Sequence, residues 1–326
     1  MVKLVTGVAG FIGFSVAQAL LDTGETVIGI DNVNDYYDVR LKEARLRLLD
    51  ARPNFVFYRR DIADIGLVDF IKDRHPDIIE IIHLAAQAGV RYSLINPYAY
   101  VQSNLQGQVV MLELARALPG LRNFVYASSS SVYGANKQTP LSVDHAVNRP
   151  ISLYAATKRA DELMTYTYSH LFKIPAVGLR FFTVYGPWGR PDMAVYLFTD
   201  AILAGRAIDV FNDGQMWRDF TYIDDIVAGV RAAHLRPPAP DADGVPHVVY
   251  NLGNHRPERL TDMITLIEGA LGQRAAIQYR PLQPGDVIST CADITSSQRD
   301  LGYEPTVSLT DGIPQFVTWF RDFYGR

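Results

Sequence analysis

The stretch KLVTGVAGFIG, residues 3–13, decides the fold. Its first half is an apolar run typical of a buried strand, and Gly7, Gly10 and Gly13 follow at the spacing GxxGxxG. Glycine allows the tight turn by which a strand passes directly into a helix, and residues 11–24 carry the apolar pattern of that helix. These residues therefore predict a strand, a glycine-rich turn and a helix in succession.

Strands and helices alternate through the first half of the chain. Further apolar runs occupy residues 26–31, 55–61, 77–86, 123–129 and 175–181, and helical patterns cover Pro97–Leu118 and Ser152–Phe172. The runs are continuous in Val, Ile and Leu rather than alternating with polar residues, as expected of strands covered on both faces. This rhythm predicts an α/β fold with a Rossmann-type, doubly wound parallel sheet.

The rhythm changes after Thr183, where glycine, proline and tryptophan gather in VYGPWGRPDM. We expect helices over residues 195–204, 222–235, 260–271 and 311–324, a strand near Val210, loops over residues 212–220 and 237–246, and a return to the main sheet at residues 248–253. This pattern predicts two domains. Residues 1–182 plus 222–252 form the sheet domain, and residues 183–221 plus 253–326 form a smaller mixed α/β domain over its edge.

Composition excludes several classes of protein. With 326 residues, 48% hydrophobic and 20% charged, the chain can bury a large core. Its net charge of −4 and the lack of a basic run argue against nucleic-acid binding. Cys291 is the one cysteine, which fits a cytoplasmic protein. We expect no signal peptide, no membrane span and no metal site, because none of the required patterns occurs.

The glycine turn predicts a dinucleotide site. Backbone N–H groups at the start of a helix bind a pyrophosphate, and glycine lets the phosphate come close. Asp31 ends the second strand, eighteen residues past Gly13, where a carboxylate accepts hydrogen bonds from the ribose hydroxyls of NAD. It would repel the extra phosphate of NADP, so NAD is the expected cofactor. Asp61, after the third strand, is placed either to meet the adenine amino group or to cap the next helix.

Tyr154 and Lys158 stand four residues apart in YAATK, and Ser129 ends an earlier strand in ASSSSVYG. Any helix brings residues four apart onto one face, so the pair alone is uninformative. The pair becomes informative because it occurs in the same chain as a predicted dinucleotide-binding loop. A free phenol has a pKa of about 10, too high for a base at neutral pH, but a neighbouring ammonium and a cationic nicotinamide ring stabilise the phenolate. Tyr154 could then remove a hydroxyl proton, with Ser129 or an adjacent serine holding that hydroxyl.

The motifs TGVAGFIG, HLAAQAGVRYS, SSSSVYG, YAATK, RFFTVYGP and DFTYIDD occur in this order. Together they resemble the extended short-chain dehydrogenase/reductase family over essentially the whole chain. The stretches DNVNDYYDVRLKEARL, AAQAGVRYS, YGPWGRPDMA and QPGD are most similar to its UDP-glucuronate 4-epimerases. The resemblance implies 4-epimerisation of UDP-glucuronate to UDP-galacturonate through a 4-keto intermediate, with tightly held NAD in the sheet domain and the UDP-sugar in the smaller one.

The resemblance also implies a set of site residues. Tyr154, Lys158 and Ser129 are catalytic. The cofactor residues are Gly7, Gly10, Phe11, Ile12, Gly13, Asp31, Asn32, Asn34, Asp61, Ile62, Leu84, Ala85, Ala86, Asn104, Ala127, Tyr154, Lys158 and Phe182. The substrate residues are Gln87, Arg91, Ser129, Ser130, Ser131, Tyr154, Thr183, Arg190, Phe211, Arg218 and Asp286.

Individual roles follow from the same resemblance. Arg218 and Asp286 would hold the nucleotide, and Phe211 would pack near uracil. Gln283 stands where many relatives have arginine, which removes one phosphate contact. A substrate carboxylate needs donors, and Arg190, with Thr183, Ser130 and Ser131, could supply them. Arg91 is a further candidate.

Other functions stay open at this point. A UDP-glucose/UDP-galactose 4-epimerase would use Arg190 on a phosphate, and a UDP-glucuronate decarboxylase shares the cofactor, triad and substrate. A 4,6-dehydratase needs an acid where Ser130 and Ser131 stand. A non-catalytic NAD-binding sensor on the same fold need not keep the serine, tyrosine and lysine together. The helices expected at Pro97–Leu118 and Ser152–Phe172 could form a homodimer interface, because relatives commonly dimerise through these helices.

Overall fold

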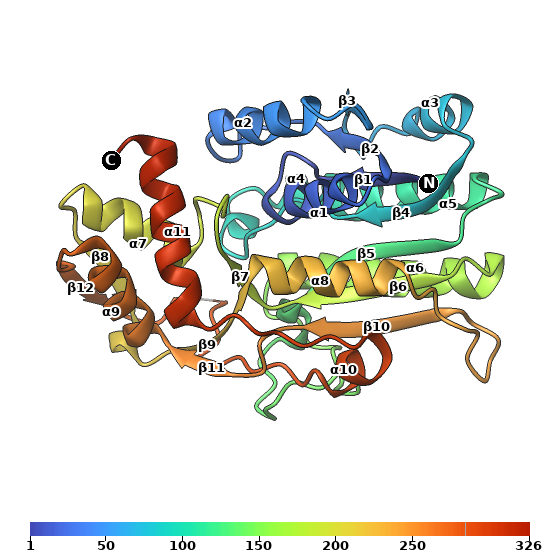
Figure 1. Ribbon diagram of the computed structural model, residues 1–326. Coiled ribbons are helices and arrows are strands. Elements are labelled where there is room, and N and C mark those ends of the chain that lie inside the picture. The colour runs from blue at the N-terminus through green and yellow to red at the C-terminus, as the bar shows by residue number, and fades with distance from the viewer. Residues whose placement is uncertain (284) are drawn as a thin grey trace.

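A seven-stranded sheet forms the centre of the molecule in the computed structural model, which describes residues 1–283 and 285–326 (Figure 1). In spatial order its strands are β10 (His247–Leu252), β6 (Ala176–Phe181), β5 (Asn123–Ser129), β4 (Ile78–His83), β1 (Val2–Thr6), β2 (Thr26–Asp31) and β3 (Phe55–Arg59). All neighbours are parallel. The predicted doubly wound sheet is therefore confirmed, including the return of the chain at β10.

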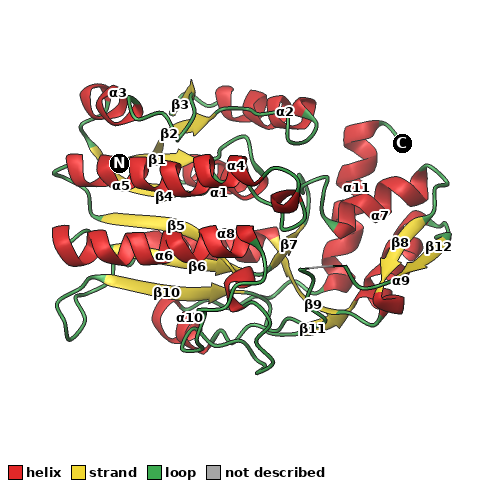
Figure 2. Cartoon of the chain, turned by 180° about the vertical axis from the view of Figure 1, so that it is seen from behind, coloured by secondary structure: helices red, strands yellow, loops and turns green. Residues whose placement is uncertain are grey.

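Helices cover both faces of this sheet, as its continuous apolar strands require. One face carries α1 (Phe11–Asp22), α2 (Val39–Asp50) and α8 (Ile223–His234), and the other carries α3 (Leu67–Arg74), α5 (Gly107–Ala117) and α6 (Leu153–Phe172) (Figure 2). Two cores result, because successive strand residues point to opposite faces. Leu4 belongs to one core and Val5 to the other, and both are fully buried.

The helix predicted over Pro97–Leu118 is not continuous. It begins as α4 (Pro97–Tyr100), widens into a π-helical segment at Val101–Gln106 and continues as α5. Asn104 lies within this segment, fully buried, and its amide bonds the backbone N–H of Gln87 at 2.8 Å and the carbonyl of Gln87 at 3.1 Å. The expected helical character of this stretch is confirmed, but the helix is irregular, and such π-helical widening often occurs at functional sites.

A smaller lobe follows β6. It contains a three-stranded sheet of β7 (Thr183–Tyr185), β9 (Trp217–Tyr222) and β11 (Pro257–Arg259), a pair of β8 (Ile208–Phe211) and β12 (Ile277–Arg280), and the helices α7 (Ala194–Leu203), α9 (Leu260–Leu271) and α11 (Leu309–Tyr324). The short helix α10 (Thr295–Leu301) packs against β10 and α8. The chosen domain boundaries stay a prediction.

The expected loop over residues 212–220 was wrong in its second half, which forms the start of β9. The polar pair Arg218 and Asp219 hid the strand pattern. Asp219 is fully buried because its carboxylate accepts the backbone N–H groups of Asn254, His255 and Ala292. A buried carboxylate with these partners replaces the apolar residue that a strand pattern would show.

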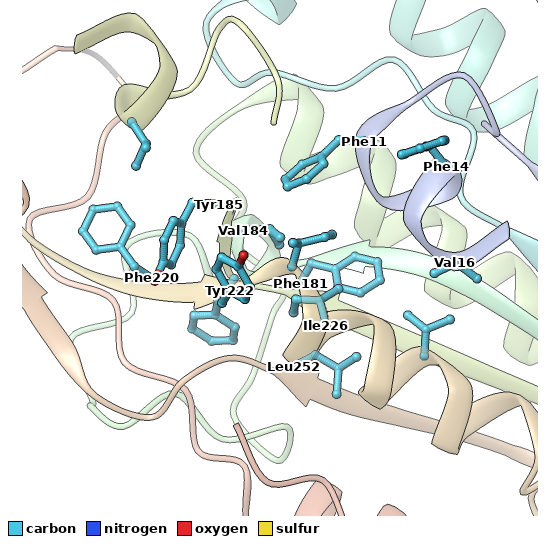
Figure 3. Packing of buried hydrophobic residues seen from close by; sticks show 14 of the residues in the cluster. Phe11, Phe14, Val16, Phe181, Val184, Tyr185, Phe220, Tyr222, Ile226 and Leu252 are labelled. Carbon is cyan, nitrogen blue, oxygen red and sulfur yellow. The ribbon is translucent and has the colours of Figure 1, made fainter. Parts of the chain in front are cut away.

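One apolar core crosses from the large lobe into the small one. Phe11 and Phe14 of α1, Phe181 of β6, Tyr185 of β7 and Phe220 of β9 all belong to this core (Figure 3). The shared core holds the two lobes together at the carboxyl ends of the central strands. Among the residues described, no helix is long and apolar enough to cross a membrane.

Candidate active site

A cavity of about 940 Å³ opens at the carboxyl ends of the central strands. Its wall includes Gly7 after β1, Asp31 at the end of β2, Leu84 after β4, Ser129 at the end of β5 and Phe182 after β6. The strand order reverses between β1 and β4, and ligands of open α/β sheets bind at such a switch point. Further wall residues come from α6 of the large lobe and, as with Arg190 and Arg218, from the small lobe.

The glycine turn closes tightly at one end of this cavity. A Cβ at Gly13 would lie 2.0 Å from the carbonyl oxygen of Gly7, so no larger residue fits where α1 meets β1. Asp31 braces the same turn, because its carboxylate accepts the backbone N–H groups of Ala9 at 3.1 Å and Val33 at 2.8 Å. Burial raises the pKa of Asp31, and these two hydrogen bonds and the Lys42 ammonium oppose that rise. Lone pairs remain on both oxygens for ribose hydroxyls.

Two expected cofactor residues do not line the cavity as the structure describes it. Asp61 accepts the side-chain amide of Asn32 at 3.0 Å and the backbone N–H of Ala63 at 2.8 Å, within a local turn. It does not cap a helix, because α3 begins only at Leu67 and its N-cap is Gly66. Asn104 clamps Gln87, and its amide also donates to Thr157 at 2.9 Å. Both therefore support residues of the cavity wall, and a direct cofactor contact of either stays a prediction.

Tyr154 and Lys158 both line the cavity from the start of α6. Ser152 caps this helix by accepting the backbone N–H of Ala155 at 3.1 Å. The Lys158 ammonium donates to Asp161 at 2.7 Å, and both side chains are buried. Burial raises the pKa of Asp161 to about 6, although Lys158 opposes the rise. The helix therefore holds a lysine cation one turn from the tyrosine.

The four serines at the end of β5 differ in their partners. Ser128 donates its hydroxyl to Glu162 at 2.6 Å, inside the protein. Ser129 accepts the backbone N–H of Ser131 at 3.1 Å and so caps the 3₁₀ turn Ser130–Tyr133. Ser129 thus keeps its hydroxyl proton for another acceptor, which favours it over Ser128 as the catalytic serine.

A buried ion pair supports this serine turn from behind. The Arg180 guanidinium of β6 binds Glu162 of α6 at 2.8 and 3.0 Å, and also donates to the Tyr133 hydroxyl at 3.0 Å. Burial alone would raise the pKa of Glu162, but Arg180, Ser128 and Arg159 hold it below its usual value. One carboxylate therefore joins α6 to the serine turn.

Cations gather at the far end of the cavity. Arg91 binds Asp286 at 3.0 Å and lies 4.8 Å from the ring centre of Phe211. Arg218 also lines this end, where burial lowers its pKa and Arg91 reinforces the effect, while Asp286 opposes it. Two arginines in the wall of one cavity are suited to an anionic ligand. Pro284 of the QPGD motif lies outside the described residues.

Arg190 is paired rather than free. Its guanidinium binds the Asp192 carboxylate, and Tyr36 donates its hydroxyl to the same carboxylate at 3.1 Å. Burial would lower the pKa of Arg190, but the charge of Asp192 raises it. The sequence did not single out Asp192 or Tyr36, nor the cavity residue Lys42, which donates to Asn34. In the sequence these three residues share only one feature, which is that each is a polar side chain within a stretch that resembles the family.

The parallel sheet, the glycine turn with its aspartate and the shared wall of serine, tyrosine and lysine define an enzyme of the short-chain dehydrogenase/reductase type. The chain belongs to the NAD dependent epimerase/dehydratase family, whose sequence model matches residues 3–253. The expected family and fold class are both confirmed.

Three relatives show how close the similarity is. The chain is 51% identical to an uncharacterized 37.6 kDa protein of Escherichia coli O111:H-, over 99% of both chains. It is 44% identical to a probable UDP-glucuronate 4-epimerase of Rhizobium meliloti, over 99% of this chain and 98% of the relative. The solved UDP-glucuronic acid 4-epimerase of Bacillus cereus, in complex with UDP-glucuronic acid and NAD, matches with a TM-score of 0.91 and 36% identity, over 99% of this chain and 100% of that one.

Proposed function

We propose that this protein is an NAD-dependent UDP-glucuronate 4-epimerase that forms UDP-galacturonate through a 4-keto intermediate. The observation that carries the proposal is the placement of Arg190 in the wall of the cavity that also holds Tyr154, Lys158 and the serines. A cation near the catalytic group suits a sugar with a carboxylate at C5. The full-length relatives named as UDP-glucuronate 4-epimerases support it.

The residues would divide the reaction as follows. The glycine turn and Asp31 would hold NAD, which would supply the acceptor, and later the donor, of the C4 hydride. Tyr154 removes the proton of the C4 hydroxyl and gives it back, and Lys158 stabilises the phenolate. Ser129 orients that hydroxyl. Because the hydride must return to the opposite face, Arg218 and Asp286 hold the nucleotide while the keto sugar turns.

The alternatives lack such a supporting feature. A dehydratase needs an acid beside the reacting hydroxyl, and Ser130 and Ser131 occupy that part of the cavity wall. A UDP-glucose epimerase does not need the Arg190 cation. A decarboxylase must let the C5–carboxylate bond align with the carbonyl π system, which a fixed guanidinium opposes. A sensor would not need the catalytic residues.

We expect the purified protein to convert UDP-glucuronate to UDP-galacturonate and to leave UDP-glucose largely unchanged. Each nucleotide sugar is incubated separately, and the products are resolved by NMR, which distinguishes the C4 epimers and any UDP-pentose. Release of UDP-pentose as the main product would indicate a decarboxylase instead, and conversion of UDP-glucose alone would indicate the neutral-sugar epimerase.

We also propose a homodimer in the cytoplasm. Large apolar side chains are exposed along α4, the π-helical segment, α5 and α6, namely Tyr98, Val101, Val109, Leu163 and Tyr166. An apolar patch of this kind, on neighbouring helices, is typical of a protein interface. The free thiol of Cys291, the one cysteine, agrees with a reducing compartment.

Replacing Leu163 with glutamate should convert this dimer to a monomer, because the charge would be buried in the interface. Light scattering after gel filtration measures the mass directly. Leu235→Glu is the matched control, since Leu235 is 59% exposed and Leu163 53%, but Leu235 follows α8 on the opposite face of the sheet. A monomeric wild type would refute the proposed dimer.

A further inference from the structure

We propose that Asp192 acts as a counter-charge to Arg190, which keeps the grip on the substrate carboxylate weak enough for the sugar to turn. This inference rests on the proposed function, because it assumes that Arg190 meets a carboxylate at C5. It assigns a rate-setting role to Asp192, which would not itself contact the reacting atoms.

The geometry of the pair leaves only part of Arg190 available. Its Nε donates to Oδ1 of Asp192 at 3.0 Å, and its Nη2 donates to Oδ2 at 2.5 Å. Both donors lie on one edge of the planar guanidinium, so Nη1 and the second proton of Nη2 remain for another acceptor. The side chains of Arg190 and Asp192 are 24% and 29% exposed, and both residues line the cavity. A carboxylate ligand would therefore meet a cation that is already half-neutralised.

Asp192 is also held in this position by a tyrosine of the large lobe. Tyr36, from the loop after β2, donates to its Oδ2 at 3.1 Å, and the Tyr36 ring packs on Tyr92 with centroids 4.8 Å apart. Gly89 makes the approach possible, since a Cβ there would lie 2.4 Å from the Tyr36 hydroxyl oxygen. Burial would raise the pKa of Asp192, but Arg190 and Tyr36 hold it below its usual value. The counter-charge is therefore present at neutral pH.

Epimerisation explains why a weakened cation is useful. The keto sugar must present its opposite face to the returning hydride, so the C5 carboxylate has to leave its donors and bind again. An arginine without a counter-charge would hold the carboxylate in a strong bidentate pair before and after the turn. Such binding stabilises the states before and after the turn but not the turn itself, so it raises the free-energy barrier to the turn and slows the reaction. Asp192 reduces that binding by competing for the same guanidinium.

The test replaces Asp192 with asparagine, which keeps the size and removes the charge. We expect KM for UDP-glucuronate to fall about tenfold and kcat to fall by a similar factor, because hydrogen bonds to charged groups differ by about this much from neutral ones. Calorimetry with UDP, which has no sugar carboxylate, should give an unchanged Kd. Asp300→Asn is the control for charge loss, since Asp300 also pairs with an arginine, Arg299, and neither residue lines the described cavity.

A purely structural role for Asp192 would give a different result. If Asp192 only fixes the loop, D192N raises KM or lowers kcat alone, and either result overturns the inference, as does a variant with wild-type constants. A lower KM together with a lower kcat supports it. Failure of the proposed function is seen separately, because the wild-type protein would then not epimerise UDP-glucuronate at all.

Discussion

Replacing Tyr154 with phenylalanine is expected to lower kcat for UDP-glucuronate epimerisation by about 10²- to 10⁴-fold, the usual contribution of a positioned general base. The variant loses only the hydroxyl that would exchange a proton with the C4 oxygen. Tyr154 is partly exposed to the cavity, and its ring packs edge-on against Tyr100 with centroids 6.1 Å apart. Phenylalanine can keep that packing, so the fold and the binding of UDP should be unaffected.

The rate is measured by NMR of the C4 epimers, and folding by circular dichroism during heating. Tyr279→Phe is the matched control, because Tyr279 lies on β12, is 58% exposed and does not line the described cavity. It should retain wild-type kcat. A Tyr154→Phe protein that turns over UDP-glucuronate within threefold of the wild-type rate would exclude the phenol as the base.

The parts of this site that the sequence predicted are local ones. The glycine turn, Asp31 and the YAATK helix each depend on residues within one strand–turn–helix unit, so spacing along the chain determines their geometry. The central sheet was predictable for a similar reason, because continuous apolar runs indicate strands that are covered on both faces.

The missed features depend on residues far apart in the chain. Tyr36 and Asp192 are separated by 156 positions, and no pattern around either one indicates that they meet. The π-helical segment forms where Asn104 bonds Gln87, which the apolar periodicity does not show. Strand β9 was missed because Asp219 takes its partners from residues 254, 255 and 292. Each feature is a polar contact made by tertiary structure, whereas periodicity reports apolar burial.

Replacing Arg180 with methionine is expected to lower the free energy of unfolding by about 3–5 kcal/mol, the usual cost of leaving one member of a buried ion pair alone. Arg180 and Glu162 are 3% and 1% exposed, so water cannot replace the lost partner. Arg159 and Ser128 still contact Glu162, but Arg159 is 32% exposed and its charge is partly screened. The serine turn should loosen as well, because Tyr133 also loses its bond to Arg180.

Urea unfolding at neutral pH measures the loss, and Arg299→Met is the control. Arg299 pairs with Asp300 but is 71% exposed, so its removal should leave the free energy of unfolding close to that of the wild type. A loss of similar size in both variants would mean that the Arg180–Glu162 pair contributes no more than a surface pair.

The pH dependence of this deficit identifies its cause. Arg180 and its neighbours hold the pKa of Glu162 in the folded protein below its usual value. The wild type therefore has this stabilisation in full when the pH is above the usual pKa of a glutamate. It loses the stabilisation as the pH falls through the lower pKa of the folded state. Without Arg180 the buried carboxylate is raised in pKa and takes up a proton more readily, so the difference between variant and wild type should shrink as the pH falls toward 4. Adding Glu162→Gln to Arg180→Met should recover part of the loss at pH 7, since no unpaired charge is then buried. A deficit that is constant with pH and is not reduced in the double variant would instead indicate lost packing of the arginine side chain.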